Sequence, residues 1–206
     1  STTTEGMSSD EAVKLMRGNA GTKVVLSIYR PSTKQELVFE LKRKEIKIET
    51  VKKQMLEENI GYIRLSEFNA QSAEDIAKML KELNKDGMTA LILDLRNNPG
   101  GLLDSAIEIC GLFIKEESLV VSTKGRDKLQ EQRYVTKKKP LYPDLPIAVL
   151  INRGSASASE IVAGTLQDYK RALIIGGNSF GKGSVQTIIP LSDGNALRLT
   201  IAKYYL

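Results

Sequence analysis

The sequence has no histidine and a single cysteine, Cys110, among its 206 residues. Without histidine, the Ser-His and Cys-His pairs of many nucleophilic enzymes are impossible, and one cysteine allows neither an internal disulfide nor a cysteine cluster for zinc. Any acid-base chemistry must therefore use Lys, Asp, Glu or Tyr. The longest apolar run, residues 147–151, is far short of the roughly 18 residues that cross a bilayer, and no charged-then-apolar leader opens the chain. The sequence thus predicts no membrane span.

Charge of one sign is also scarce. Lys and Arg number 30 against 25 Asp and Glu, which leaves a formal charge of +5, and the two basic stretches, 42–53 and 137–139, are interleaved with or flanked by acidic or apolar residues. Nucleic-acid binding would place such charges beside stacking aromatics or a groove-reading motif, and neither is present. We therefore expect solvated basic faces and no nucleic-acid partner. The length and the 41% of hydrophobic residues suit one globular domain with a small companion.

Apolar periodicity and turn residues predict the order of elements. A short helix ending near residue 17, capped by Ser9 and Asp10, precedes two strands at 22–29 and 36–41, and the charged stretch 42–53 marks a boundary. Beyond it we expect strands at 60–65, 90–95, 119–122, 133–136, 147–152 and 172–176, helices at 72–84 (capped by Ser72), 102–113 and 157–168, and a hairpin of 184–191 with 196–205 that turns at 192–195. Strands joined by crossover helices predict an α/β core with parallel pairing.

The first segment that could carry chemistry is residues 154–160 (GSASASE), between a buried strand and a helix. Ser157 and Glu160 fit a capping box, and most such serines only cap helices. A serine at a helix N-terminus also faces unpaired N–H groups and the positive end of the helix dipole, which would stabilise an oxyanion. Both interpretations stay open on this segment alone.

The second segment, residues 176–183 (GGNSFGKG), resembles a phosphate-binding loop. The match fails because Gly183 stands where a Mg²⁺-binding Ser or Thr is needed, and because the following residues predict a strand instead of a helix. Lys182 could instead be a general base, provided that burial lowers a lysine pKa from about 10.4 toward 7 or 8. A surface lysine on a loop is the alternative.

The third segment, residues 94–101 (DLRNNPGG), follows a predicted strand. Its two glycines expose backbone N–H groups at the strand end, where α/β proteins place ligands. Asp94 and Arg96 could equally form a structural ion pair that holds the loop.

Together with residues 180–187 (FGKGSVQT), these segments resemble the carboxy-terminal processing proteases, tail-specific peptidases that use a Ser/Lys dyad. They occur in the family's order and spacing, and the resemblance extends over nearly the whole chain. It implies that Ser157 is the nucleophile and that Lys182, 182 − 157 = 25 residues later, is the base. By the same resemblance Gln186 orients the lysine. The backbone N–H groups of Ala158 and of Gly100 or Gly101 form the oxyanion hole, and the supporting positions are Asp94, Arg96 and Glu160.

The resemblance also implies a domain organisation. Residues 1–45 are expected to be the C-terminal half of a PDZ domain, and residues 46–206 an α/β core of crotonase-like or Clp-protease-like architecture that stops before the family's own end. The expected partners are protein or peptide substrates with apolar C-terminal tails, with no metal and no cofactor. The implied location is extracytoplasmic, such as periplasm, cell envelope or thylakoid lumen. Membrane association of the full-length protein and homo-oligomerisation are left open.

The predicted function is therefore that of a serine endopeptidase that recognises an apolar C-terminal tail and cleaves through an acyl-enzyme. One alternative is a non-catalytic, PDZ-type peptide-binding protein with an inert core. Another is an acyl-thioester enzyme of the crotonase type, although such an enzyme does not need a Ser and a Lys at this spacing.

Overall fold

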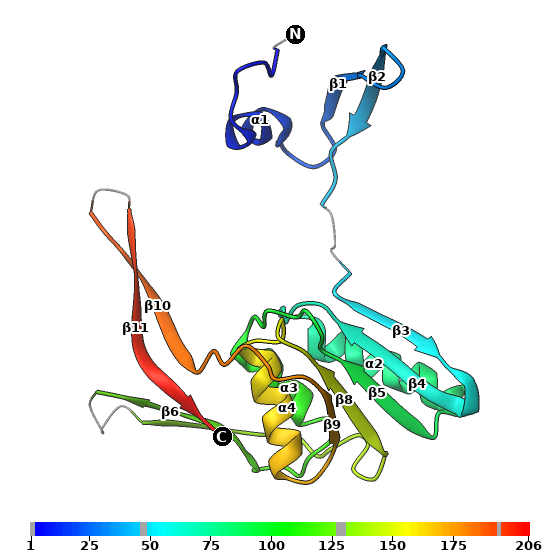
Figure 1. Cartoon of the computed structure of the whole chain (residues 1–206), viewed down its shortest axis with the longest axis vertical. Coiled ribbons are helices and arrows are strands. Elements are labelled where there is room, and N and C mark those ends of the chain that lie inside the picture. Colours follow the sequence, from blue (N-terminus) through cyan, green and yellow to red (C-terminus); the bar gives the residue numbers. More distant parts are fainter. Residues whose placement is uncertain (1–2, 46–48, 127–130, 193–194) are drawn as a thin grey trace. The chain divides into compact units, whose positions relative to one another are not determined.

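The computed structural model describes residues 3–45, 49–126, 131–192 and 195–206, apart from the side chain of Ile188 (Figure 1). It divides into two units, Ser1–Ile48 and Glu49–Leu206. Each unit is one continuous stretch of the chain.

The first unit contains α1 (Ser9–Met16), β1 (Lys23–Arg30) and β2 (Gln35–Lys42). The predicted cap at Ser9 and Asp10 is wrong by one residue, since Ser8 caps α1: its Oγ accepts a hydrogen bond from the Glu11 N–H (3.3 Å), and the Glu11 carboxylate accepts one from the Ser8 N–H (2.9 Å). Only Ser8 has a glutamate three residues later, which is what a capping box requires.

The predicted antiparallel pair of β1 and β2 is confirmed, and it reverses at residues 31–34. Arg43 joins this pair to the end of α1, because its guanidinium donates to the carbonyl oxygens of Met16 and Lys23, each at 2.8 Å. None of the described side chains of this unit is fully buried.

The second unit is organised around a five-stranded sheet in the order β3-β4-β5-β8-β9. The predicted parallel core is confirmed, since four of its strands run parallel: β4 (Ile60–Leu65), β5 (Ala90–Asp94), β8 (Ile147–Ile151) and β9 (Leu173–Gly176). Edge strand β3 (Val51–Met55) pairs antiparallel with β4, whereas the sequence patterns predict no strand there. Its charged residues favour a boundary, but an exposed edge accommodates them, and Lys53 forms an ion pair with Glu82 at 2.9 Å.

Three helices accompany this sheet: α2 (Ser72–Lys85), α3 (Leu103–Cys110) and α4 (Ala158–Asp168). The predicted apolar face of α2 is confirmed by the burial of Ala73, Ile76, Leu80 and Leu83. Ser72 is the first helical residue instead of the N-cap, which is Gln71, because the Ser72 hydroxyl accepts from the Asn69 N–H at 2.9 Å. Helix α3 is shorter than predicted and gives way to a turn after Cys110.

A second, antiparallel sheet has the order β10-β11-β6-β7, with β6 (Leu119–Gly125), β7 (Gln132–Val135), β10 (Ser184–Pro190) and β11 (Ala196–Tyr205). The predicted hairpin of β10 and β11 is confirmed, and Figure 1 shows it extending away from the five-stranded sheet. Asp193 and Gly194 of the predicted turn lie outside the described residues. A single 3₁₀ turn, η1 (Glu57–Asn59), precedes β4. In the described ranges, no helix is long and apolar enough to cross a membrane.

The core lies between the five-stranded sheet and its helices, so removal of a buried side chain there should be costly. We expect Leu80→Ala, at a position with no exposed surface, to lower the free energy of unfolding by about 2 to 5 kcal/mol, because it leaves a cavity. Chemical denaturation measures this. The exposed neighbour Lys81→Ala is the control, and an equal loss in both variants would contradict this packing.

Candidate active site

The three sequence segments meet at one edge of the five-stranded sheet. Strands β5 and β8 are parallel neighbours, with Asp94 opposite Leu150, so the loops that follow them emerge side by side. Several hydrogen bonds join these loops, among them the Ala156 N–H to the Asn98 carbonyl (3.0 Å) and the Ser155 hydroxyl to the Leu95 carbonyl (2.8 Å). The carboxyl ends of parallel strands are where α/β proteins bind ligands.

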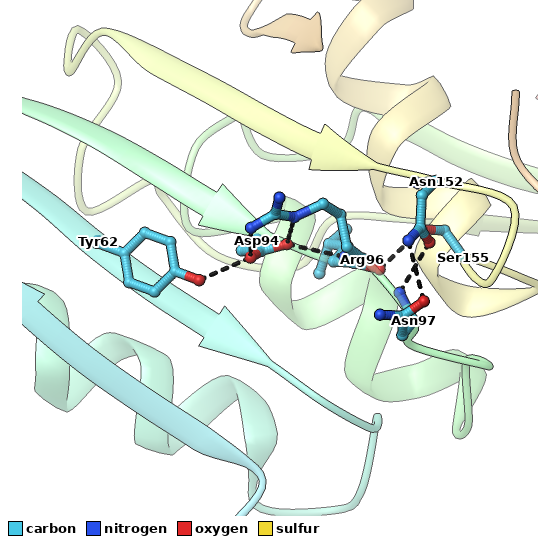
Figure 2. A network of polar contacts seen from close by, with 7 residues as sticks. Tyr62, Asp94, Arg96, Asn97, Asn152 and Ser155 are labelled. Carbon is cyan, nitrogen blue, oxygen red and sulfur yellow. Dashed lines mark hydrogen bonds and ion pairs between the residues drawn. The ribbon is translucent and has the colours of Figure 1, made fainter. Parts of the chain in front are cut away.

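Asp94 anchors the first loop through the network in Figure 2. Its side chain is fully buried and accepts hydrogen bonds from Arg96 Nε on Oδ1 (2.9 Å), Arg96 Nη2 on Oδ2 (2.6 Å) and the Tyr62 hydroxyl on Oδ2 (2.6 Å). Burial alone would raise the pKa of Asp94, but the hydrogen bonds from Arg96 and Tyr62 outweigh it and hold that pKa below its ordinary value. Burial, together with the Asp94 charge, raises the pKa of Tyr62. Asp94 and Arg96 thus form a structural ion pair.

A reciprocal amide pair joins the two loops farther along (Figure 2). The Asn97 N–H donates to Asn152 Oδ1 (2.9 Å), and Asn152 Nδ2 donates to Asn97 Oδ1 (2.9 Å). Asn152 Oδ1 also accepts from the Gly154 N–H (3.0 Å). One side chain therefore holds the backbone of both loops.

Ser157 is the N-cap of α4 and has an unusual backbone conformation, with φ 56° and ψ −115°. These angles suit glycine, and a residue with a Cβ adopts them only at a cost of order 1 to 3 kcal/mol. The Glu160 carboxylate accepts from the Ser157 N–H at 2.8 Å, as the capping-box pattern predicts. Surrounding contacts thus hold a half-buried serine in a strained turn at the start of a helix.

The same Glu160 carboxylate fixes the glycine-rich loop. It accepts from the Ser179 hydroxyl and the Gly181 N–H on Oε1, both at 2.7 Å, and from the Lys182 N–H on Oε2 at 2.9 Å. Partial burial alone would raise the pKa of Glu160, but these bonds and the one from Ser157 lower it below its ordinary value. A negative charge in the first turn of α4 is also favoured by the helix dipole.

The structure therefore brings Ser157 and Lys182 together through their backbones, whose N–H groups both donate to Glu160 Oε2. The Lys182 side chain is exposed, and across the described ranges no hydrogen bond joins its ammonium group to the Ser157 hydroxyl. Gln186 has its amide Nε2 3.5 Å from Thr200 Oγ1, a weak contact. A hydrogen bond between Gln186 and Lys182 is likewise absent from the described residues.

The glycine pair lies directly against the serine. A Cβ at Gly100, whose φ is 99°, would lie 2.7 Å from the Ala156 oxygen, 2.8 Å from Ser157 Cβ and 3.0 Å from the Ala158 nitrogen. Only glycine permits this approach. The Gly100 N–H donates to Asn98 Oδ1 (2.9 Å), and a side chain at Gly101 would collide with the Phe68 carbonyl.

The described residues form neither the loop-to-helix motif of a phosphate site nor a cluster of metal ligands. Strand β10 begins at Ser184, so the glycine-rich loop leads into a strand and not into the helix that a phosphate-binding loop requires, as the sequence indicates. Within the part of the chain that the structure describes, no three Cys, Asp or Glu side chains could hold a metal ion together.

Comparison with known families identifies this arrangement. The model of peptidase family S41 matches residues 59–206, which include all three segments. The chain belongs to peptidase family S41. Carboxy-terminal-processing proteases of Bartonella bacilliformis and Synechocystis are similar at 48% identity over 204 residues and 43% over 205, covering 97% and 98% of this chain. The processing protease CtpB of Bacillus subtilis is 39% identical over 204 residues, or 97% of the chain.

These S41 relatives are longer proteins. The chain spans 46%, 47% and 42% of the three, respectively, or about half their length. Among solved structures, the photosystem II D1 C-terminal processing protease aligns with a TM-score of 0.68 at 31% identity, over 99% of this chain and 56% of that one. An S41 protein of Bacteroides fragilis shares the fold, with a TM-score of 0.66 at 19% identity over 95% of this chain and 58% of its own.

Three residues that hold the loops of the site in place are not identified by the sequence motifs: Tyr62, Asn98 and Asn152. Tyr62 reaches Asp94 from the neighbouring strand β4, a contact that appears only once β4 and β5 are paired. Asn98 is fully buried, and its amide donates to the Leu65 carbonyl at 2.9 Å. Asn152 follows β8 directly, and a polar residue at the carboxyl end of a parallel strand is the sequence feature that could have identified it.

The four bonds to Glu160 should make stability depend on pH. Its pKa is lowered in the fold, so protons bind the unfolded chain first, and the stabilisation is lost as pH falls from about 4.3 toward the folded pKa. We expect Glu160→Gln to lose less unfolding free energy than the parent between pH 7 and pH 3, as measured by denaturation. Removal of an exposed carboxylate, Glu116→Gln, is the control. If Glu160→Gln loses as much unfolding free energy as the parent between pH 7 and pH 3, Glu160 is not the source of the pH dependence.

The strained turn at Ser157 predicts a second effect on stability. Ser157→Gly should unfold with a free energy about 1 kcal/mol higher than Ser157→Ala, because only glycine adopts the positive φ without steric cost. Thermal or denaturant unfolding of the two variants compares them directly. Equal stability would mean that the turn relaxes in solution.

Proposed function

We propose that the second unit is the catalytic core of a serine endopeptidase in which Ser157 is the nucleophile and Lys182 the general base. The observation that carries this proposal is the Glu160 carboxylate, whose Oε2 accepts from the backbone N–H groups of both residues, at 2.8 and 2.9 Å. Two residues 25 positions apart are thereby held at one helix N-terminus. The absence of histidine leaves lysine as the natural partner for a serine.

In this reaction, Ser157 Oγ attacks the carbonyl carbon of the scissile peptide bond while the neutral Lys182 amine takes the hydroxyl proton. The tetrahedral intermediate then collapses, and Lys182 returns the proton to the leaving amine as the C–N bond breaks. Water hydrolyses the resulting acyl-enzyme by the same two proton transfers. Gln186, near the start of β10, would orient the lysine.

The intermediate's oxyanion requires two donors at hydrogen-bond distance. We assign one to the Ala158 N–H, at the first helical residue of α4, and the other to Gly100 or Gly101 on the facing loop. The close approach of Gly100 to Ser157 supports this assignment. Because the Gly100 N–H already donates to Asn98 Oδ1, Gly100 would have to exchange that bond, whereas Gly101 would not.

The exposed Lys182 side chain must turn toward Ser157 for catalysis. Its backbone N–H is bound to Glu160, so we propose that the side chain rotates while the backbone of the loop stays in place. A polypeptide bound over the loop would exclude water from the amine, and such exclusion favours the neutral form that a base requires.

Recognition of the substrate is proposed to involve the first unit. We assign residues 1–45 to the C-terminal half of a PDZ domain, a module that binds extended peptides along a sheet edge. The helix and antiparallel strand pair of this unit support the assignment. Several relatives are named for carboxy-terminal processing. We therefore propose protein substrates with apolar C-terminal tails, met in an extracytoplasmic compartment.

A non-catalytic peptide-binding role is the second candidate. It is favoured by one observation, the exposed Lys182 side chain without a hydrogen bond to the serine among the described residues. Cleavage assays separate the two functions, since a binding protein retains a tailed peptide intact.

Replacing either member of the dyad should abolish cleavage. We expect Ser157→Ala and Lys182→Arg each to lower kcat by roughly 10³-fold or more, because the first removes the nucleophile and the second supplies a side chain that stays protonated. Mass spectrometry of an unstructured protein with an apolar C-terminal tail measures the products.

The exposed loop variant Lys170→Arg serves as the matched control for this experiment, and circular dichroism checks that all variants fold. Cleavage retained by either dyad variant would refute the assignment. Intact substrate with every variant and with the parent, together with measurable peptide binding, would instead establish the non-catalytic function.

A further inference from the structure

We propose that Asn152 is a positioning residue, whose side chain sets the separation between the loop after β8 (residues 152–157, the serine loop) and the loop after β5 (residues 95–102, the glycine loop) and so completes the oxyanion hole. The inference rests on the proposed peptidase function, which does not itself assign a role to this residue. Asn152 touches none of the reacting atoms and acts through the backbone of its neighbours.

The side chain of Asn152 makes three hydrogen bonds, of which two join it to Asn97 on the opposite loop (Figure 2) and one lies within its own loop. Its Oδ1 accepts from the Asn97 N–H at 2.9 Å and from the Gly154 N–H at 3.0 Å, and its Nδ2 donates to Asn97 Oδ1 at 2.9 Å. The bond within its own loop shapes the turn that leads to Ser157, and the two bonds to Asn97 fasten that turn to the opposite loop.

The position of Asn97 is linked to that of Gly100, three residues later, through Asn98. Asn98 comes next, and its Oδ1 accepts from the Gly100 N–H at 2.9 Å. The Asn98 carbonyl also accepts from the Ala156 N–H and from the Ser159 hydroxyl, each at 3.0 Å. Displacement of Asn97 would therefore shift Gly100 relative to Ser157.

The fit between the loops at this point is close. A Cβ at Gly154 would lie 2.8 Å from Asn97 Cα and 2.9 Å from Asn97 Oδ1. The amide pair of Asn97 and Asn152 thus lies where the two backbones are already near contact, and its loss would let them separate. The positive φ of Asn97, 59°, places that residue in a conformation that asparagine tolerates better than most residues.

Such a separation should affect the transition state more than the bound substrate. The two proposed oxyanion donors belong to different loops, Ala158 to one and the glycines to the other. The developing oxyanion needs both donors within about 2.7 to 3.1 Å, whereas the planar carbonyl of the bound peptide depends less on them. A positioning role therefore predicts a lower kcat with little change in KM.

The test compares cleavage of one tailed protein substrate by the parent and by Asn152→Ala. We expect kcat to fall by roughly 10- to 100-fold while KM stays within about threefold, because misplacement by about 1 Å costs up to 10²-fold. Affinity for a peptidyl boronic acid, which forms a tetrahedral adduct with an active-site serine, should fall by a similar factor.

The conservative variant Asn152→Asp should restore most of the activity. Its carboxylate still accepts the Asn97 and Gly154 N–H groups, and the Asn97 amide can turn over to donate to it. The matched control is Asn69→Ala. Asn69 lies half-buried in another loop of the same unit and also makes three side-chain hydrogen bonds, to Thr50, Gln71 and Ser72, but none to either loop of the site. The kcat of Asn69→Ala should equal that of the parent.

Three results would overturn the inference: unchanged kcat in Asn152→Ala, a loss confined to KM, or an equal kcat loss in Asn69→Ala, which would indicate general destabilisation. Failure of the proposed peptidase function would be seen in the parent protein itself. If the parent neither cleaves nor binds the boronic acid, the peptidase proposal fails, and the positioning role fails with it.

Discussion

The parallel pairing of β5 with β8 is the constraint on which the site depends. It makes two loops that are more than fifty residues apart in sequence emerge side by side, and the bonds from Ser155 to Leu95 and from Ala156 to Asn98 close the gap between them. Without this register, the glycines could not approach Ser157, whose strained turn is stabilised by contacts from both loops. The five-stranded sheet is thus the frame that sets the geometry of the site.

Two carboxylates, those of Asp94 and Glu160, hold the loops of the site through their hydrogen bonds. Asp94 is buried beneath the glycine loop and balanced by the Arg96 guanidinium, while Glu160 is balanced by backbone N–H groups and a helix dipole. A buried carboxylate without such donors would be costly. Each charge instead organises a loop, so the polar groups of the site are structural as well as chemical.

Much of this architecture could be predicted from local patterns. The apolar repeat of α2 and the buried strands β5 and β8 are encoded by neighbours in sequence, and the parallel core followed from crossover helices. The edge strand β3 could not be predicted, because its lysines lose little by lying exposed at a sheet edge. Ser72 resembled a cap but lies inside its helix, since the choice between adjacent residues depends on the Asn69 contact.

For the candidate site, sequence motifs identified the loops but not what holds them together. Tyr62 and Asn152 contribute through partners 32 and 55 residues away, distances over which no periodicity carries information. The exposure of the Lys182 side chain is likewise beyond motif reasoning, since a motif carries no information on how a side chain is oriented. Family resemblance supplies roles for Ser157 and Lys182, and the structure supplies the scaffold between them.

The two junctions of the site differ in kind. The contact between the serine and glycine loops is made by amides, hydroxyls and backbone groups, all without net charge, whereas the loop of residues 176–183 that carries Lys182 (the lysine loop) is attached to an ionised carboxylate. Mobile ions screen the field of a charge that water can reach but have little to act on in a neutral hydrogen bond. Concentrated salt would therefore loosen the lysine loop first and leave the serine and glycine loops joined, so the two halves of the site tolerate different ionic surroundings.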